Sequence, residues 1–165
     1  MMLSEKYSQE EINLYNPAFC ATLLFESIRE YQSISDKGMH CSLPYLVIPM
    51  CVNPQISSFL PNSISTPVAG WVANNEGVLV EFAASATAFI LIVDSAINFL
   101  IEKRGIDINE EGLFLITDDK VAKKATLISK NTDLNNAYRA AGMLGRWFAS
   151  ASSVESVFAQ LGVRP

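Results

Sequence analysis

The chain contains 165 residues and has a mass of 18.1 kDa, so we expect a single domain spanning residues 1–165 with a core of its own. Half of its residues are hydrophobic and only 18% are charged, whereas about a quarter of the residues are charged in typical domains. This surplus of apolar residues predicts a surface that an obligate partner covers, and an unusually large core is the alternative.

The net charge of −5 is unevenly distributed along the chain. Residues 1–119 contain five Lys or Arg and fifteen Asp or Glu, a net charge of −10, whereas residues 120–165 contain seven basic and two acidic residues, a net charge of +5. Such a split predicts either an acidic protein partner or a nucleic acid for the basic C-terminal portion, residues 120–165. The acidic bulk argues against autonomous, high-affinity DNA binding, because that binding depends on neutralising phosphates.

The first predicted helix begins at Asn16-Pro17, a favoured N-cap followed by a favoured first-turn residue, and runs to about Tyr31. Apolar residues recur along it at helical spacing, with Glu26, Arg29 and Glu30 on the other side. Residues 38–75 then contain no Asp, Glu, Lys or Arg but five prolines, which predicts several short helices. Within this stretch we expect LPYLVIPMCV, residues 43–52, to be a buried hub.

A long helix is predicted from about Val78 or Glu81 to Glu102. Because this helix is apolar on nearly all sides before Asp94, we expect it to be central in the fold. Lys103 and Arg104 are expected on its last turn, with Gly105 just past it. Residues 106–117 have the pattern of a β-hairpin. Because a helix followed by a short hairpin is typical of winged-helix domains, the predicted class is mainly α, α+β at the margin: a helical domain with one β-hairpin, winged-helix-like.

The basic C-terminal portion predicts three more helices. Thr117-Asp118-Asp119 is expected to cap a short basic helix over residues 120–129, and Asn131 to Asp133 to cap the next helix. The last helix is predicted to begin at the capping box Ser152-x-x-Glu155 and to end at Gly162.

No membrane segment is predicted. The longest uncharged run of the most apolar stretch, Phe82 to Val93, ends after twelve residues at Asp94, whereas a spanning helix needs about 20. The N-terminal residues carry Glu5, Glu10 and Glu11 and no apolar region of the kind a signal peptide has. We therefore expect a cytoplasmic protein that does not contact a membrane.

The sequence offers little for catalysis or metal binding. His40 is the only histidine, and no elbow, phosphate-loop, dinucleotide or zinc-protease motif is present. The three cysteines, Cys20, Cys41 and Cys51, lack the Cys-x-x-Cys spacing, so reduced and buried thiols are favoured over a metal site with His40. We predict no catalytic residue, no metal and no cofactor; a small hydrolase that uses His40 is the rival hypothesis.

The best candidate interface lies near the C-terminus. Arg139, Gly142 and Arg146 are predicted to lie on one stripe of a helix, and a glycine within a helix indicates close approach of another element. That element belongs either to this domain or to a partner whose acids meet both arginines. Because Trp147 and Phe148 are adjacent, we expect one of the two rings to face another surface.

Three segments resemble one family. The ending LGRWFASASSVESVFAQLGVRP is similar to the C-terminal signature of the middle components of bacterial three-component ABC systems. NPAFCATLLFESIREY and LPYLVIPMCVNPQISSFLP resemble that family's opening helix and the segment after it, and the likeness runs from about Glu11 to Pro165. Carried over by position, the signature falls on residues 145–148 and 161–165.

This resemblance implies a non-catalytic adaptor that is the partner of an SMC/RecN-like ABC ATPase and a third component in defence against phage and other mobile DNA. It implies an obligate hetero-oligomer that meets DNA only through the complex, and a DNA-binding winged-helix protein is the alternative. The predicted partner interface comprises Arg139, Gly142, Arg146, Trp147, Val163, Arg164 and Pro165.

Overall fold

The computed structural model describes residues 15–118, 120–121 and 124–164. In chain order its elements are α2 (Pro17–Ile34), β1 (Met39–His40), α3 (Pro44–Cys51), α4 (Pro54–Ser57), α5 (Val68–Asn74), α6 (Glu76–Leu79), α7 (Phe82–Ala88), α8 (Ile90–Glu102), β2 (Ile106–Ile108), β3 (Leu113–Ile116), α9 (Thr126–Lys130), α10 (Thr132–Ala149) and α11 (Val154–Leu161). The mainly helical class with a minor β component is confirmed.

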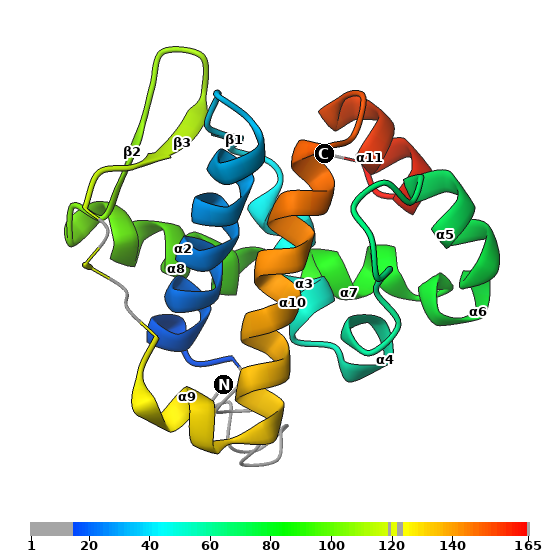
Figure 1. Cartoon of the computed structure of the whole chain (residues 1–165), viewed down its shortest axis with the longest axis horizontal. Coiled ribbons are helices and arrows are strands. Elements are labelled where there is room, and N and C mark those ends of the chain that lie inside the picture. The colour runs from blue at the N-terminus through cyan, green and yellow to red at the C-terminus, as the bar shows by residue number, and fades with distance from the viewer. Residues whose placement is uncertain (1–14, 119, 122–123, 165) are drawn as a thin grey trace.

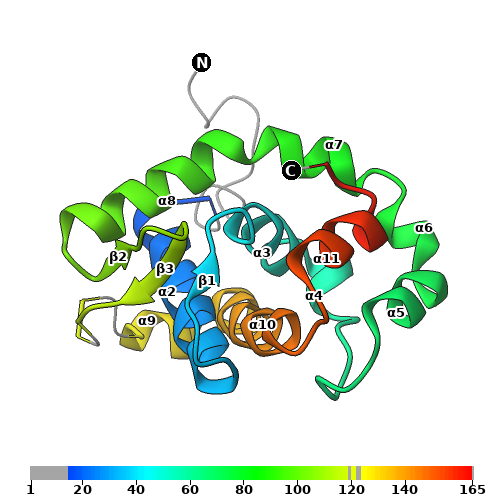
Figure 2. The same cartoon turned by 90° about the horizontal axis from the view of Figure 1, so that it is seen from above.

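Helices α2 and α10 lie side by side through the molecule, and α3 packs against both (Figure 1). Seen from above, α8 and α10 lie on opposite sides, with α2 and α3 between them (Figure 2). Helix α3 is the predicted hub: all of its residues except Tyr45 are buried. The apolar surplus of the charge-free stretch is therefore used largely in the core.

Local signals place the helix ends. The Asn16 side chain accepts hydrogen bonds from the N–H groups of Ala18 and Phe19 at the start of α2. Asn131 caps α10 in the same manner, and Gly162 follows α11 in the left-handed conformation with φ of 73°. The predicted capping box of α11 is displaced by one residue, because Ser153, not Ser152, accepts from the N–H of Ser156.

The hairpin is confirmed and is part of a larger sheet. Strands β2 and β3 pair antiparallel, with Gly112 in the turn at φ of 77°, and β1 adds a third antiparallel strand in the order β1-β3-β2. Residues 39–40 were expected in no strand, and β1 pairs only Met39 with Phe114 and His40 with Leu113. A strand of two residues is too short to show alternation in a sequence.

The single long helix predicted up to Glu102 is wrong. The segment forms α6, α7 and α8, and the axis bends by 58° between Glu76–Ala88 and Ile90–Glu102. The bend lets α7 pack against α3 while α8 packs against α2. Helix α8 is not central: one face is buried, and Leu91 on its first turn is 78% exposed.

Two helix boundaries also differ from expectation. Residue Arg104, with φ of 59°, is the left-handed residue after α8, and Gly105 instead lies against the Val121 side chain. The basic helix predicted over 120–129 is wrong in its first half, because residues 120–121 form a turn and α9 begins at Thr126. Residues 119, 122 and 123 of that prediction lie outside the described residues.

Candidate functional site: a cationic cavity on helix α10

Helix α10 carries three of the predicted interface residues to one cavity. Arg139, Gly142 and Arg146 line it together with Lys124, and its volume is about 480 Å³. The end of α4, at Ser57 and Ser58, contributes to the lining from across the chain. The predicted stripe is therefore a hollow between elements and not a flat helix face.

The glycines of α10 allow a close approach of α2. A Cβ atom on Gly145 would lie 2.2 Å from the backbone oxygen of Ser27, and one on Gly142 would lie 3.3 Å from Glu26 Oε1. Of the two readings left open for Gly142, close packing within the domain is the one observed. The glycines let α2 lie close enough for its Glu30 carboxylate to reach Arg146 and its Glu26 carboxylate to reach Tyr138 of α10.

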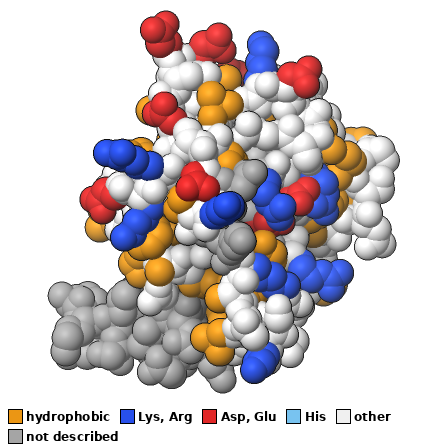
Figure 3. Space-filling view, turned by 60° about the vertical axis from the view of Figure 1, so that its left-hand side comes forward, with side chains coloured by type: hydrophobic (Ala, Val, Ile, Leu, Met, Phe, Trp, Pro, Cys, Tyr) orange, Lys and Arg blue, Asp and Glu red, His pale blue; other side chains and the backbone are white. Residues whose placement is uncertain are grey.

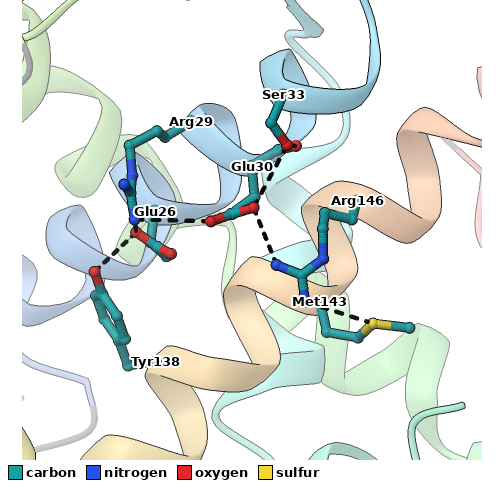
Figure 4. A network of polar contacts seen from close by, with 7 residues as sticks. All are labelled: Glu26, Arg29, Glu30, Ser33, Tyr138, Met143 and Arg146. Carbon is teal, nitrogen blue, oxygen red and sulfur yellow. Dashed lines mark hydrogen bonds and ion pairs between the residues drawn. The ribbon is translucent and has the colours of Figure 1, made fainter. Parts of the chain in front are cut away.

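One ion pair and one hydrogen bond join α10 to the two carboxylates of α2, and Arg29 of α2 adds an ion pair within its own helix (Figure 4). Arg146 Nη1 donates to Glu30 Oε2 at 3.0 Å, and the Tyr138 hydroxyl donates to Glu26 Oε2 at 2.8 Å. Arg29 Nε donates to the same Glu26 oxygen at 3.1 Å, and its Nη2 bonds that oxygen as well. These partners occupy the Glu26 and Glu30 carboxylates.

The protonation of this network follows from burial and bonding. Desolvation and the hydrogen bond to Glu26 raise the pKa of Tyr138 to about 12. The hydrogen bond to Glu26 also raises the pKa of the Arg29 guanidinium above its ordinary value. Tyr138 is therefore a neutral donor and Arg29 a cation at physiological pH.

The cavity has more positive charge than its own carboxylates neutralise. Glu26 is the one carboxylate among its described lining residues, and Arg29 and Tyr138 already engage it. Arg139 is exposed and forms no hydrogen bond or ion pair with another described residue. Among the described residues, Lys124 donates only to the neutral Asn135 side chain, at 2.8 Å, and it lies over the Tyr138 ring. Such a site favours anionic groups.

Basic side chains also gather on the surface beside α9. In Figure 3 they extend across the middle and lower part of the face, and acidic side chains are more frequent toward its top. This distribution agrees with the charge split along the sequence, because residues 120–165 supply most of the chain's Lys and Arg.

Trp147 lies in the interior, so the expectation that one of the two adjacent rings faces another surface is wrong. Trp147 is 1% and Phe148 is 3% exposed. The indole N–H of Trp147 donates to the Thr66 carbonyl at 2.7 Å, and its ring meets Trp71 edge to face. Helix α10 is covered on more than one side, so adjacent positions are both buried.

The remaining predicted residues lie elsewhere. Val163 is half-buried against the core and Arg164 is exposed, and both line a second, apolar depression beside α8. Pro165 lies outside the described residues. The two depressions share no described lining residue, so Arg139, Gly142 and Arg146 line one of them and Val163 and Arg164 the other.

The groups considered for catalysis have structural partners. His40 Nδ1 lies 2.7 Å from Ser42 Oγ and 3.2 Å from Ser42 N, which places both contacts within the turn before α3. No disulfide joins Cys20, Cys41 and Cys51, all of which are described, and burial raises the pKa of Cys20 to about 12. Within the described residues, no group of three or more His, Cys, Asp or Glu side chains is placed to hold a metal ion.

Within the same residues no single helix is long and apolar enough to cross a membrane. The bent pair Glu76–Ala88 and Ile90–Glu102 reaches the required length and composition only when its two parts are taken together.

Sequence reasoning missed Glu26, Lys124, Ser57 and Ser58 as cavity residues. The acidic and basic residues of α2 were expected on the side away from its packing face, yet Glu26 is only 7% exposed. The spacing of Glu26, Arg29 and Glu30 by three and four residues was the available signal, because it clusters charge on one side of α2.

Searches of curated proteins and of solved structures found no significant match. Residues 4–165 match the family described as "ABC-three component (ABC-3C) system Middle Component 3". The match covers nearly the whole chain, and the resemblance noted in its C-terminal segment is confirmed. The chain therefore belongs to the family of ABC-three component system middle components.

Proposed function

We propose that this middle component is a non-catalytic adaptor that joins an SMC/RecN-like ABC ATPase to the third component of its system. The complex acts in the cytoplasm against phage or other mobile DNA. The cationic cavity is the observation that carries the interface assignment, because Arg139 stands exposed at a cavity without a free carboxylate.

In this proposal an acidic segment of one partner enters the cavity. A partner carboxylate pairs with Arg139 and a second one meets Arg146, whose side chain is still 37% exposed beside Glu30. Charge-assisted hydrogen bonds to arginine are stronger than neutral ones and favour planar, bidentate geometry. Ser57 and Ser58 provide hydroxyl groups on the opposite wall.

The topology supports the proposal that a winged-helix-like arrangement contacts a protein partner. Helix α8 precedes the hairpin β2–β3 in a three-stranded sheet, as a recognition helix precedes its wing. A DNA-reading helix offers Arg, Lys, Asn or Gln to the groove, but α8 exposes Leu91 and Ile101, and the hairpin turn carries Glu110 and Glu111. These residues favour a protein partner over DNA.

The test measures binding of the purified chain to each of the other two components of its own system by isothermal titration calorimetry. Arg139→Glu should raise the dissociation constant for one of the two components at least about tenfold, equivalent to about 1.4 kcal/mol. Lys37→Glu is the matched control, because Lys37 is also an exposed cation but does not line the cavity.

Thermal unfolding shows whether each variant keeps its fold. Trp147 is unsuitable for this test because its buried ring supports the fold. If the folded Arg139→Glu variant binds both components as tightly as the Lys37→Glu control, the cavity is not the interface.

A further inference from the structure

A second depression, the apolar groove, lies beside α8. Its volume is about 560 Å³, and its wall on α8 is formed by Ile90, Ile97 and Ile101. Ile108 of β2 and Val163, after α11, line it from other sides, and Arg164 is its one Lys or Arg among the described residues.

The groove leaves apolar area in water. Ile90 is 43%, Ile101 is 42% and Ile108 is 45% exposed, although the described core is otherwise closely buried. Leu91, next to Ile90, is 78% exposed. Covering apolar surface is favourable by about 25 cal/mol per Å², and contiguous exposed apolar surface marks interaction sites.

The shape of the groove suits a helix. Ile90 and Ile101 are eleven residues apart on α8, which corresponds to about three turns and about 16 Å. A strand is disfavoured at the neighbouring sheet edge. The N–H of Asn109 donates to the Leu113 carbonyl within the hairpin, so the N–H of the preceding residue, Ile108, points away from β3. The Ile108 N–H already donates to Asp107 Oδ1 at 2.9 Å and is not available to an added strand. We therefore expect the partner to be recognised through the side chains of a helix that lies in the groove.

The charges of the groove select an acidic helix. Asp94 lies on α8 between Ile90 and Ile97, and its carboxylate accepts a hydrogen bond from the Tyr45 hydroxyl. Arg164 is exposed and forms no ion pair with a described residue. No Asp or Glu is among the described residues that line the groove, so Arg164 is available to a carboxylate from outside.

We infer that the apolar groove binds an amphipathic helix of about three turns that carries an Asp or Glu at the end facing Arg164. This inference rests on the proposed function: the helix belongs to whichever of the two other components the cationic cavity does not bind. An adaptor that joins two proteins needs two separate surfaces, and α8 and α10 lie on opposite sides of the molecule (Figure 2).

The first test replaces Ile101 by lysine, a change that its 42% exposure lets the fold accommodate. Ile101→Lys should weaken binding of one component at least about tenfold and leave the other unchanged. Arg139→Glu should show the opposite selectivity. Val80→Lys is the matched control, because Val80 is 78% exposed and does not line the groove.

The second test identifies the occupant. A photo-crosslinking amino acid at position 101, in the complex of all three components, should label a segment with apolar residues at helical spacing and a nearby Asp or Glu. Reversing that acid to Arg should restore the binding that Arg164→Glu loses.

The outcomes separate the two proposals. If the wild-type chain binds neither component, the proposed function fails. If it binds both and Ile101→Lys binds both equally well, only the groove assignment fails. Loss of the same component from Ile101→Lys and Arg139→Glu, or crosslinking to a second copy of this chain, would also overturn it.

Discussion

Replacing Gly145 by alanine tests the close approach of α2 to α10. The new Cβ would lie 2.2 Å from the Ser27 carbonyl oxygen and 3.0 Å from its carbon, where ordinary contact begins at 3.4 Å. The obstacle is backbone, and α2 is held on another side by α8, so α2 cannot yield freely. Overpacking of this kind costs about 1–3 kcal/mol, and the clash here places it at or above the upper end.

The helix preference of alanine offsets part of this cost. Gly→Ala within a helix favours folding by about 1 kcal/mol, so we expect Gly145→Ala to lower the free energy of unfolding by about 2 kcal/mol. That loss is a large share of the roughly 5–15 kcal/mol typical of a domain. Urea unfolding followed by circular dichroism measures it as a lower midpoint at an unchanged slope.

Two other glycines provide graded controls. The nearest atoms to a Cβ on Gly142 belong to the flexible Glu26 and Glu30 side chains, at 3.3 Å and beyond, so Gly142→Ala should stay within about 1 kcal/mol of wild type. A Cβ on Gly70 of α5 meets nothing within 4 Å in the described chain, so Gly70→Ala should be neutral or stabilising. If Gly145→Ala is as stable as Gly142→Ala, the reasoning about backbone contact is refuted.

Two further predictions concern polar side chains between α2 and α10. The Ser27 hydroxyl is buried and has no hydrogen-bond partner in the described chain. Ser27→Ala should therefore raise the free energy of unfolding, measured with urea, by about 1 kcal/mol. Equal or lower stability of the variant would show that the hydroxyl has a partner. The raised pKa of Tyr138, about 12, adds stability that is complete below its unfolded pKa near 10 and is lost as the pH rises to 12. Between pH 9 and pH 11.5, the urea midpoint of the Tyr138→Phe variant should thus decrease less than the midpoint of the wild type. An equal decrease in both proteins would contradict the raised pKa of Tyr138.

The candidate site was only partly predictable. Arg139, Gly142 and Arg146 lie at helical spacing, so their common stripe followed from the periodicity of one helix. Glu30, which pairs with Arg146, is 116 residues away in sequence, and no local pattern joins the two. Trp147 was misplaced for the same reason, since its carbonyl acceptor, Thr66, is 81 residues away.

Features that depend on a few neighbouring residues could be read directly from the amino-acid sequence. The caps at Asn16, Asn131 and Gly162, the short helices between prolines and the hairpin turn at Gly112 all follow from bonds or backbone angles within one turn. The family relationship was also readable from the chain alone.

The positions of the helix bends and of the surface depressions depend on packing between distant parts of the chain. The break before α8 follows from which faces α2 and α3 can cover, and an apolar run does not record that choice. Tertiary packing also divided the predicted interface between α10 and the apolar groove beside α8. The physical reason is that burial is a property of all neighbours in space, whereas periodicity describes one element at a time.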